Sequence, residues 1–148
     1  MHQLSWGFSI RLTLHTDYAL RILLHTAAEP GVRLSIADVA EKHGISRNHV
    51  MKVVNLLATS GLLDTARGRG GGFTLARDPA AITVGEVVRL TEPSLRPADC
   101  AVCVLRRGCG MIPVLDDALQ AFLEVLDNRT LADAVRETTL PFKRIALG

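Results

Sequence analysis

Residues 35–61 read SIADVAEKHGISRNHVMKVVNLLATSG, and this stretch decides the fold. Ser35 and Ser46 each precede a run with apolar residues at helical spacing, and a serine hydroxyl is a favoured helix cap. Gly44 lies between the two runs, where a glycine can end a helix in the left-handed conformation. The stretch therefore predicts two short helices joined by a tight turn, with the second helix reaching about Ser60.

A β-hairpin is predicted immediately after the second helix. Residues 62–66 and 73–75 are patterned as strands, and between them residues 67–72 read RGRGGG, a basic and glycine-rich tip. Upstream, Thr16 is expected to cap a further helix that ends near Ala28. Three helices followed by a basic hairpin are typical of a winged helix-turn-helix, so the predicted fold is mainly α with a small β-hairpin wing.

Positive charge is concentrated on this unit. The whole chain has a formal net charge of +2, yet the segment 42–77 contains one acid, Asp64, and the basic residues Lys42, Arg47, Lys52, Arg67, Arg69 and Arg77. A helix in the major groove presents its first turn to base edges, and a wing reaches phosphates or the minor groove. We therefore predict binding to double-stranded DNA through Ser46, Arg47, Asn48, His49 and Lys52 on the second helix, and Arg67, Arg69 and Gly70 on the wing.

Each of these elements alone has an ordinary explanation. Helix-turn-helix-like triples occur in many helical proteins, and a basic glycine-rich turn is often only a solvated loop. A phosphate-binding loop is disfavoured, because no Lys-Ser or Lys-Thr pair follows the glycines of 67–72. The order of the elements and the local charge together favour DNA binding.

Cys100, Cys103 and Cys109 are the only cysteines of the chain, and they fall within ten residues. Their C-x2-C-x5-C spacing gathers three soft ligands on one loop, as an iron–sulfur cluster or a thiophilic metal requires. Such a site is one ligand short, so a fourth must come from elsewhere. A catalytic thiol is disfavoured because every histidine lies upstream of this segment. A structural zinc site stays open, although zinc sites usually show a second paired motif.

A long helix is predicted after the cysteine loop, starting at Pro113. Its apolar stripe either packs inside the chain or forms a dimer seam, and comprises Leu115, Ala118, Leu119, Phe122, Val125 and Leu126. Thr83 and Thr130 are expected to cap two shorter helices. The predicted organisation is an N-terminal extension at 1–9, a winged helix-turn-helix domain at 10–92, a cysteine loop at 93–111, and a long C-terminal helix with its tail at 112–148.

Composition narrows the class of protein. The odd number of cysteines argues against a secreted disulfide framework and for reduced thiols in the cytoplasm. No apolar run approaches the roughly 18 residues of a membrane span, and the first residues lack a signal-peptide pattern. We therefore do not expect a membrane protein. We also find no paired acid–base constellation, so we do not expect an enzyme.

Several segments carry a family resemblance, of which SRNH at 46–49 and LDNRTLAD at 126–133 are the most specific. The others are 11–13, 16–21, 67–72, 82–88 and 119–123. With these, the chain from Arg11 to about Pro141 resembles the NsrR-type, nitric-oxide-sensing repressors within the IscR-like family of winged-helix regulators. The resemblance implies that the three cysteines bind an iron–sulfur cluster, [4Fe-4S] or [2Fe-2S], across a homodimer whose interface is the long helix. It also implies that the cluster-loaded protein represses at a palindromic operator, and that nitric oxide attacks the cluster and releases the DNA.

Two positions depart from that family pattern. The gap between Cys100 and Cys103 is two residues rather than the usual four or five, and Ile112 stands where the IscR branch has a histidine. Asp17 matches an N-terminal aspartate that completes the cluster from the partner subunit in some NsrR-like proteins. An acid near a helix start also stabilises the helix dipole without any metal, and His15 is a weaker candidate ligand. Two alternatives to nitric oxide sensing stay open, an iron- or cluster-supply sensor and a zinc-stabilised interaction module.

Overall fold

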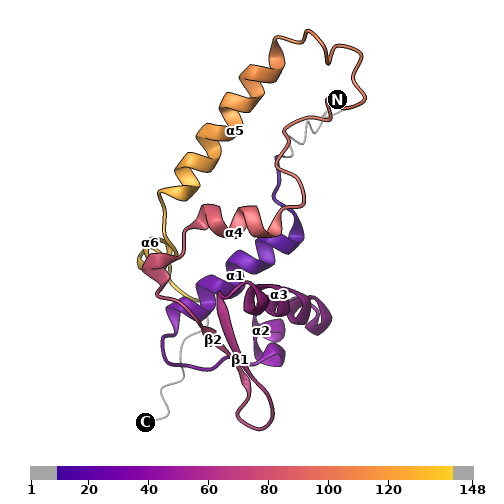
Figure 1. The fold of residues 1–148 in the computed structure, drawn as a ribbon. Coiled ribbons are helices and arrows are strands. Elements are labelled where there is room, and N and C mark those ends of the chain that lie inside the picture. The colour runs from indigo at the N-terminus through magenta and orange to yellow at the C-terminus, as the bar shows by residue number, and fades with distance from the viewer. Residues whose placement is uncertain (1–9, 142–148) are drawn as a thin grey trace, which may run out of the picture.

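A computed structural model describes residues 10–141, so the predicted extension at 1–9 and the end of the predicted tail, 142–148, lie outside the described residues. Within that range the chain is mainly helical and has one antiparallel hairpin, which confirms the predicted fold class (Figure 1). The elements are α1 (Leu14–Ala28), α2 (Ile36–His43), α3 (Arg47–Thr59), β1 (Leu63–Ala66), β2 (Gly72–Leu75), the 3-10 helix η1 (Pro79–Ala81), α4 (Val84–Thr91), α5 (Met111–Asp127) and α6 (Leu131–Arg136). None of the helices in this part of the chain is long and apolar enough to cross a membrane.

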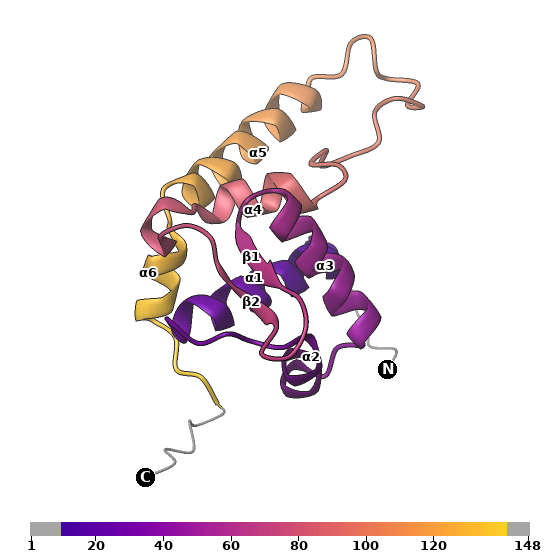
Figure 2. The ribbon, with the colours of Figure 1, turned by 60° about the horizontal axis from the view of Figure 1, so that its bottom comes forward.

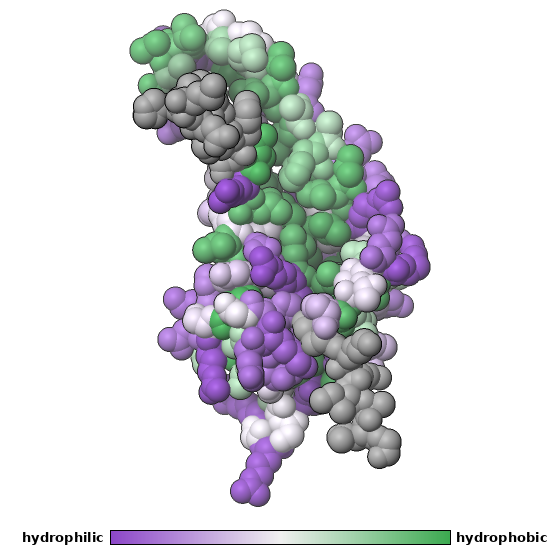
Figure 3. Space-filling model, turned by 180° about the vertical axis from the view of Figure 1, so that it is seen from behind, coloured by the Kyte–Doolittle hydropathy of each residue, from purple (hydrophilic) through white to green (hydrophobic). Residues whose placement is uncertain are grey.

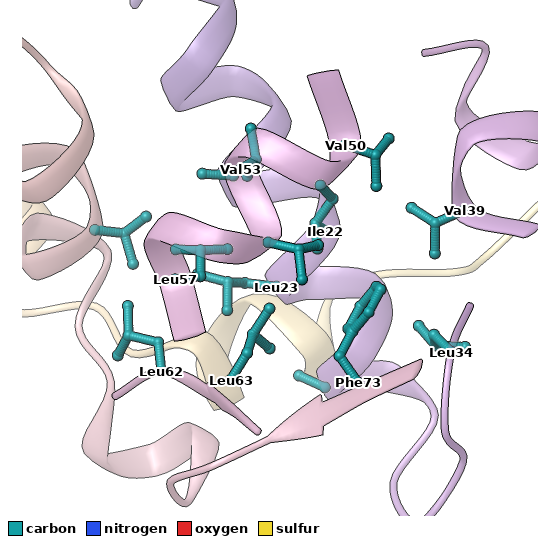
Figure 4. Close-up of a cluster of buried hydrophobic side chains, with 14 of the residues drawn as sticks. Ile22, Leu23, Leu34, Val39, Val50, Val53, Leu57, Leu62, Leu63 and Phe73 are labelled. Carbon is teal, nitrogen blue, oxygen red and sulfur yellow. The ribbon is translucent and has the colours of Figure 1, made fainter. Parts of the chain in front are cut away.

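The hydrophobic core lies where α1, α3 and the hairpin meet. Ile22 and Leu23 of α1, Leu57 of α3 and Phe73 of β2 are each no more than 1% exposed, and Figure 4 shows their side chains gathered in one cluster. Val39 adds α2 to the same cluster. Burial of each large apolar side chain contributes about 1.5–3 kcal/mol. No cysteine belongs to this core, so the helix-turn-helix unit has a source of stability that is independent of the thiols.

Helix α1 begins earlier than the sequence indicated. Its cap is Thr13, whose hydroxyl accepts a hydrogen bond from the Thr16 backbone N–H at 3.3 Å, so the prediction that Thr16 is the cap is wrong. Thr16 is instead fully buried, and its hydroxyl lies 2.8 Å from that of Thr91 in α4. Either threonine can cap a helix, and the choice depends on a tertiary contact that sequence spacing does not reveal. Asp17 consequently occupies the fourth position of the helix rather than the first.

The wing is attached to the segment that precedes α2. Strands β1 and β2 pair antiparallel, and Leu34 forms a further bridge with Phe73 through hydrogen bonds of 3.0 and 2.8 Å. A Cβ on Gly72 would overlap the carbonyl oxygen of Leu34, and the Gly72 φ of 132° is one that other residues rarely adopt. The wing therefore needs glycine at this position for its own attachment to the body.

Helix α5 rises away from the core, with α4 lying against its lower end (Figure 1). Arg89 of α4 donates hydrogen bonds to both carboxylate oxygens of Asp127, the last residue of α5. Gly85 leaves the space that the Asp127 side chain occupies, since a Cβ there would overlap it. The helix begins at Met111, so the predicted start at Pro113 was two residues late and Pro113 lies within the first turn. Helix α6 then turns back onto the core.

Candidate DNA interface and cysteine loop

The first turn of α3 exposes polar side chains. The hydroxyl of Ser46 accepts a hydrogen bond from the His49 backbone N–H at 3.2 Å and so caps the helix. Gly44, with φ of 64°, ends α2 and turns the chain into α3. Arg47 and Asn48 are exposed at this end of the helix. The structure thus gathers these predicted DNA-reading residues at one accessible helix end.

His49 differs from its neighbours because it is half-buried against α1. Its ring meets the ring of Tyr18 edge to face, with centroids 4.6 Å apart, and stacks with the ring of His15 at 6.3 Å. Edge-to-face contact is a favourable geometry for aromatic pairs. A residue that the sequence assigned to DNA therefore also contacts α1, beside the apolar core that packs the two helices together.

Fewer basic side chains carry an unpaired charge than the sequence count indicated. Lys42 pairs with Asp38 at 3.0 Å, and Arg77 pairs with Glu86 at 2.6 Å. No ion pair between residues 10 and 141 engages the remaining four basic residues of the 42–77 segment, which are Arg47, Lys52, Arg67 and Arg69. These four are exposed, two on α3 and two at the wing tip, so the unpaired charge lies on the two elements predicted to meet DNA.

The cysteine loop lies at the opposite end of the molecule from the wing (Figures 1 and 2). Short turns shape it, since the Cys103 N–H donates to the Cys100 carbonyl at 3.3 Å and the Arg106 N–H to the Cys103 carbonyl at 3.2 Å. Cys103 is exposed, and Cys100 and Cys109 are partly exposed. In the described part of the chain, no three His, Cys, Asp or Glu side chains are grouped closely enough to hold a metal ion. The three thiols are ligands of the type that an iron–sulfur cluster needs, and they share one loop. In the single chain described here, they are not grouped closely enough to hold a metal ion.

A hollow of about 170 Å³ separates the loop from the first turns of α5. Cys100 and Arg96 line it from the loop, and Ile112 and Asp116 line it from α5. Ile112 places an aliphatic side chain beside the thiol, so α5 offers no nitrogen ligand at this position. Asp116 places a carboxylate on the same hollow, and the cysteine motif does not predict this residue, because Asp116 lies outside the motif.

The base of the cysteine loop is hydrogen-bonded to the start of α1. Glu92, the residue after α4, accepts hydrogen bonds from the Thr13 N–H at 2.7 Å and from the Thr13 hydroxyl at 3.2 Å. Thr91 and Thr16 add a buried pair of hydroxyls at 2.8 Å. Because α1 also carries Tyr18, one helix contacts both the base of the loop and the first turn of α3.

Asp17 lies on α1 in the same region. Its carboxylate accepts two hydrogen bonds from the Arg21 guanidinium, at 3.0 and 2.7 Å, and its side chain is 37% exposed. The guanidinium carbon of Arg21 lies 5.9 Å from the centroid of the Tyr18 ring. Asp17 does not form a ligand group with cysteines of its own chain within the described residues.

A pair of histidines, of which His25 is buried and His43 half-buried, links α1 to the turn before α3. His25 is 1% exposed, and its Nδ1 lies 3.0 Å from Nε2 of His43, the last residue of α2. Burial lowers the pKa of both imidazoles, because a charged ring is poorly stabilised away from water. Glu29, with an oxygen 3.5 Å from His25, opposes this lowering of the His25 pKa, and the charge of Lys42 adds to it. No sequence pattern predicts the pair, since 18 residues separate its members.

An apolar surface extends over the upper part of the molecule, where α5 and the cysteine loop lie, while polar residues dominate the lower half (Figure 3). The exposed apolar side chains of α5 are 41–63% exposed and comprise Met111, Val114, Phe122 and Val125. Their spacing places them on one face of the helix. The loop adds Val102, Val104 and Leu105. A surface of this kind marks an interaction site.

The capped helix with an exposed polar end, the basic wing and the glycine turn before the helix define a winged-helix regulator of transcription. Comparison with known proteins specifies the family. Residues 12–137 match the model of the Rrf2 family, described as iron-dependent transcriptional regulators, and the chain belongs to that family.

Individual relatives agree with this assignment. The chain is 46% identical over 133 residues to the HTH-type transcriptional regulator NsrR of Bacillus subtilis (strain 168), in a match that covers 86% of this chain and 91% of that protein. Among solved structures it is similar to CymR, the global cysteine regulator of B. subtilis, with a TM-score of 0.74, 26% identity, and coverage of 88% of this chain and 100% of that one. IscR of T. potens gives a TM-score of 0.70 at 28% identity, with coverage of 87% and 88%.

These comparisons decide three of the predictions. The resemblance to NsrR-type regulators and the winged-helix fold are confirmed. Rrf2 proteins are transcriptional regulators, so the prediction that the chain is not an enzyme is confirmed by its family.

Proposed function

We propose that this protein is a homodimeric transcriptional repressor that senses nitric oxide through an iron–sulfur cluster held by Cys100, Cys103 and Cys109. The observation that carries the proposal is the placement of three accessible thiols on one loop whose base, at Glu92, is bonded to the helix that also supports α3. The match to a family of iron-dependent regulators and the identity to NsrR support it. When bound, a cluster of this kind supplies iron that reacts with nitric oxide.

The proposed operator contacts follow from exposure and charge. On α3 they are Ser46, Arg47, Asn48 and Lys52, which lie at or one turn after the exposed helix end. On the wing they are Arg67, Arg69 and Gly70. We assign His49 mainly to the positioning of α3, because its half-buried ring meets the ring of Tyr18 on α1. Arginine and asparagine can pair with guanine and adenine edges, whereas the wing arginines suit phosphates or a narrow minor groove.

A second copy of the chain is the proposed partner for the apolar face of α5. The face carries Val114, Phe122 and Val125 outside any intramolecular core, and a two-fold dimer would present two reading helices to a palindromic operator. Phe122→Glu should convert the dimer to monomers in analytical ultracentrifugation. The control Gln120→Glu, on another face of the same helix, should remain dimeric; a dimeric Phe122→Glu protein would contradict this interface.

The proposed fourth ligand is Asp17 of the partner subunit. A carboxylate oxygen is a harder and more exchangeable ligand than a thiolate, which would leave one iron accessible to a small molecule. In the chain itself the Asp17 carboxylate is bonded to Arg21. Ligation would therefore compete with Arg21 for these oxygens, and a weakened Asp17–Arg21 pair would change the charge next to Tyr18 and α3. Asp116, which shares the hollow with Cys100, is the competing carboxylate from the same chain.

Anaerobic purification followed by a visible spectrum and assays of iron, sulfide and zinc tests the cofactor. We expect iron and sulfide with a visible chromophore that is lost in Cys100→Ala, Cys103→Ala and Cys109→Ala, each still folded because the core contains no cysteine. Ser94→Ala, which changes the loop and keeps all three thiols, is the matched control. Stoichiometric zinc without iron or sulfide would contradict the cluster proposal and would favour a zinc-stabilised interaction module.

The signal is tested by DNA binding of the loaded protein. We expect a nitric oxide donor to release operator DNA within the time that the chromophore changes, with the decomposed donor as the control. A regulator of iron or cluster supply is the second candidate, favoured by the description of the family as iron-dependent. If an iron chelator releases operator DNA while nitric oxide does not, that candidate would be favoured over nitric oxide sensing.

A further inference from the structure

Cys100 and Cys103 stand at the two ends of one four-residue turn. The Cys103 N–H donates to the Cys100 carbonyl at 3.3 Å, and Ala101 and Val102 form the turn between them. A hydrogen-bonded turn of this length keeps its end Cα atoms within about 7 Å, and a disulfide needs about 4.4–6.8 Å. Cys109 is separated from Cys103 by further hydrogen-bonded turns. The backbone therefore holds the first two cysteines at the ends of one turn, whereas, within the described residues, no hydrogen-bonded turn joins Cys109 to either of them.

Both thiols are open to reagents in solution. Cys103 is exposed, Cys100 is partly exposed, and Val102 between them is 84% exposed. The Arg106 guanidinium donates to the Ala101 carbonyl at 3.2 Å, which braces the turn from outside. The Asp99 carboxylate accepts a hydrogen bond from the Ala101 N–H at 3.3 Å, so the turn is held by one group of each charge.

We propose that Cys100 and Cys103 form a disulfide within the loop when the cluster-free protein meets a small-molecule disulfide such as oxidised glutathione. One cysteine thiolate attacks the S–S bond of the reagent and releases one small thiol, leaving a mixed disulfide. The second cysteine attacks that mixed disulfide, forms the Cys100–Cys103 bond and releases the other small thiol. Two electrons pass from the cysteine pair to the reagent, and the two cysteine protons end on the released thiols.

The short cysteine gap is what makes this reaction local. With four or five residues between them, the two cysteines could not close one hydrogen-bonded turn of four residues. The disulfide would withdraw two of the three thiol ligands, so a chain that had lost its cluster could not reload until it was reduced. This consequence rests on the proposed function, whereas formation of the disulfide rests on the loop alone.

The test uses the full-length, cluster-free protein equilibrated anaerobically with mixtures of reduced and oxidised glutathione, then alkylated and digested with trypsin. Arg96 precedes Pro97 and resists cleavage, so the peptide 90–106 carries Cys100 and Cys103, and the peptide 108–129 carries Cys109. We expect oxidation to leave the first peptide two hydrogens lighter and without alkyl groups. The second peptide should remain alkylated, so that one thiol of three still reacts.

The variants sharpen the result. Cys109→Ser should oxidise as the wild type does, whereas Cys100→Ser and Cys103→Ser should stop at a glutathione adduct. A bond between the two peptides, stable adducts on both cysteines of the first peptide, or thiols that stay free in excess oxidised glutathione would each overturn the proposal.

A reconstitution step separates this proposal from the proposed function. The oxidised protein, mixed with ferrous iron and sulfide without a thiol reductant, should gain less than a tenth of the chromophore of the reduced protein, and a dithiol should restore it. If the disulfide forms but the reduced protein also takes up no cluster, the proposed function fails and the disulfide stands. Equal cluster uptake by fully oxidised and reduced protein would overturn the inference that the disulfide prevents reloading of the cluster.

Discussion

The ring of His49 on α3 meets the ring of Tyr18 on α1 edge to face, with 4.6 Å between the centroids. Arg21, the partner of the Asp17 carboxylate, lies 5.9 Å from the same Tyr18 ring. The start of the same helix receives Glu92, at the base of the cysteine loop, through Thr13. Helix α1 therefore contacts both the base of the cysteine loop and α3, and under the proposed function it is the element through which the state of the loop would reach α3.

Tyr18→Ala should weaken operator binding without removing a DNA contact. An edge-to-face aromatic pair contributes about 0.5–1.5 kcal/mol, so we expect the Kd for operator DNA to rise roughly two- to tenfold. Fluorescence anisotropy with a labelled operator measures it. Tyr18→Phe keeps the ring and should bind as the wild type does, and an alanine variant with unchanged affinity would show that α3 does not need this support.

Arg47→Ala and Arg69→Ala should affect DNA binding differently. Loss of a base contact at Arg47 should cost about 1–3 kcal/mol on the operator and little on unrelated DNA. Arg69→Ala should weaken binding to all sequences alike and lower the salt dependence by about one phosphate contact. Titrations at several salt concentrations distinguish the two. If neither substitution changes DNA binding, the assignment of α3 and the wing as the DNA-binding surface would be wrong.

The His25–His43 pair predicts that stability falls in mild acid. Folding lowers both imidazole pKa values from 6.5, so the unfolded chain binds protons more readily. The stability of the neutral pair is complete above about pH 6.5 and is lost as the pH falls through the lowered values. Asp127 and Asp133, whose pKa values are lowered from 3.8 by hydrogen bonds, lose their contributions only in a more acidic range.

Urea unfolding between pH 7.5 and 5.5 measures this effect. His43→Gln removes one titrating group and keeps an amide nitrogen that can serve as the partner of His25, so its unfolding midpoint should change less with pH than that of the wild type. Arg21, Asp38 and Lys42 also act on the pair, and all three remain in the variant. A steeper or identical pH dependence in His43→Gln would contradict the assignment.

Two glycines of the wing should respond differently to alanine. Gly70 has open space around it but a φ of 73°, so Gly70→Ala should cost about 1–2 kcal/mol for the left-handed backbone. Gly72→Ala should cost about 3 kcal/mol or more, because its Cβ would meet the Leu34 carbonyl and break the bridge to Phe73. Chemical denaturation gives both values. Equal costs would show that the bridge contributes little to holding the wing.

Asp17→Ala should alter the visible spectrum of the loaded protein without bleaching it, because three thiolates would remain. Coupling between cluster state and operator affinity should also weaken, since Arg21 would lose its exchangeable partner. If Asp17 serves only the helix dipole, the substitution should cost a few tenths to about 1 kcal/mol and leave the spectrum unchanged. Asp116→Ala is the matched control for a carboxylate from the same chain.

Mixed dimers decide which chain supplies Asp17. One dimer pairs an Asp17→Ala chain with a chain that lacks all three cysteines, so the remaining loop receives an intact Asp17 from the partner. The other places both changes in one chain, so the intact loop faces a partner without Asp17. The first should have the wild-type spectrum and the second the altered one; identical spectra would exclude a ligand that crosses the interface.

The local elements were predictable because their signals lie within a few residues. Ser35, Ser46, Thr83 and Thr130 each cap the helix predicted for them. A hydroxyl three residues before a backbone N–H needs no distant partner to act. The glycine turn and the hairpin likewise follow from residues that are neighbours in sequence. The spacing of the cysteines, for the same reason, located a candidate ligand loop.

Other features depended on contacts between distant segments. Thr16 looked like a cap, but its hydroxyl is bonded to Thr91, 75 residues away, and Thr13 caps the helix instead. His49 looked like a DNA contact, and only the packing of α1 against α3 placed its ring on Tyr18.

The sequence by itself determined the order of the helices, the wing and the cysteine loop, because capping, periodicity and turn chemistry act over a few residues. Tertiary structure alone decided that Arg77 is paired with Glu86, that Glu92 is bonded to the start of α1, and that the apolar face of α5 is left uncovered. The physical reason is that pairing and burial depend on which surfaces meet when the chain packs, and residues far apart in the sequence supply those surfaces.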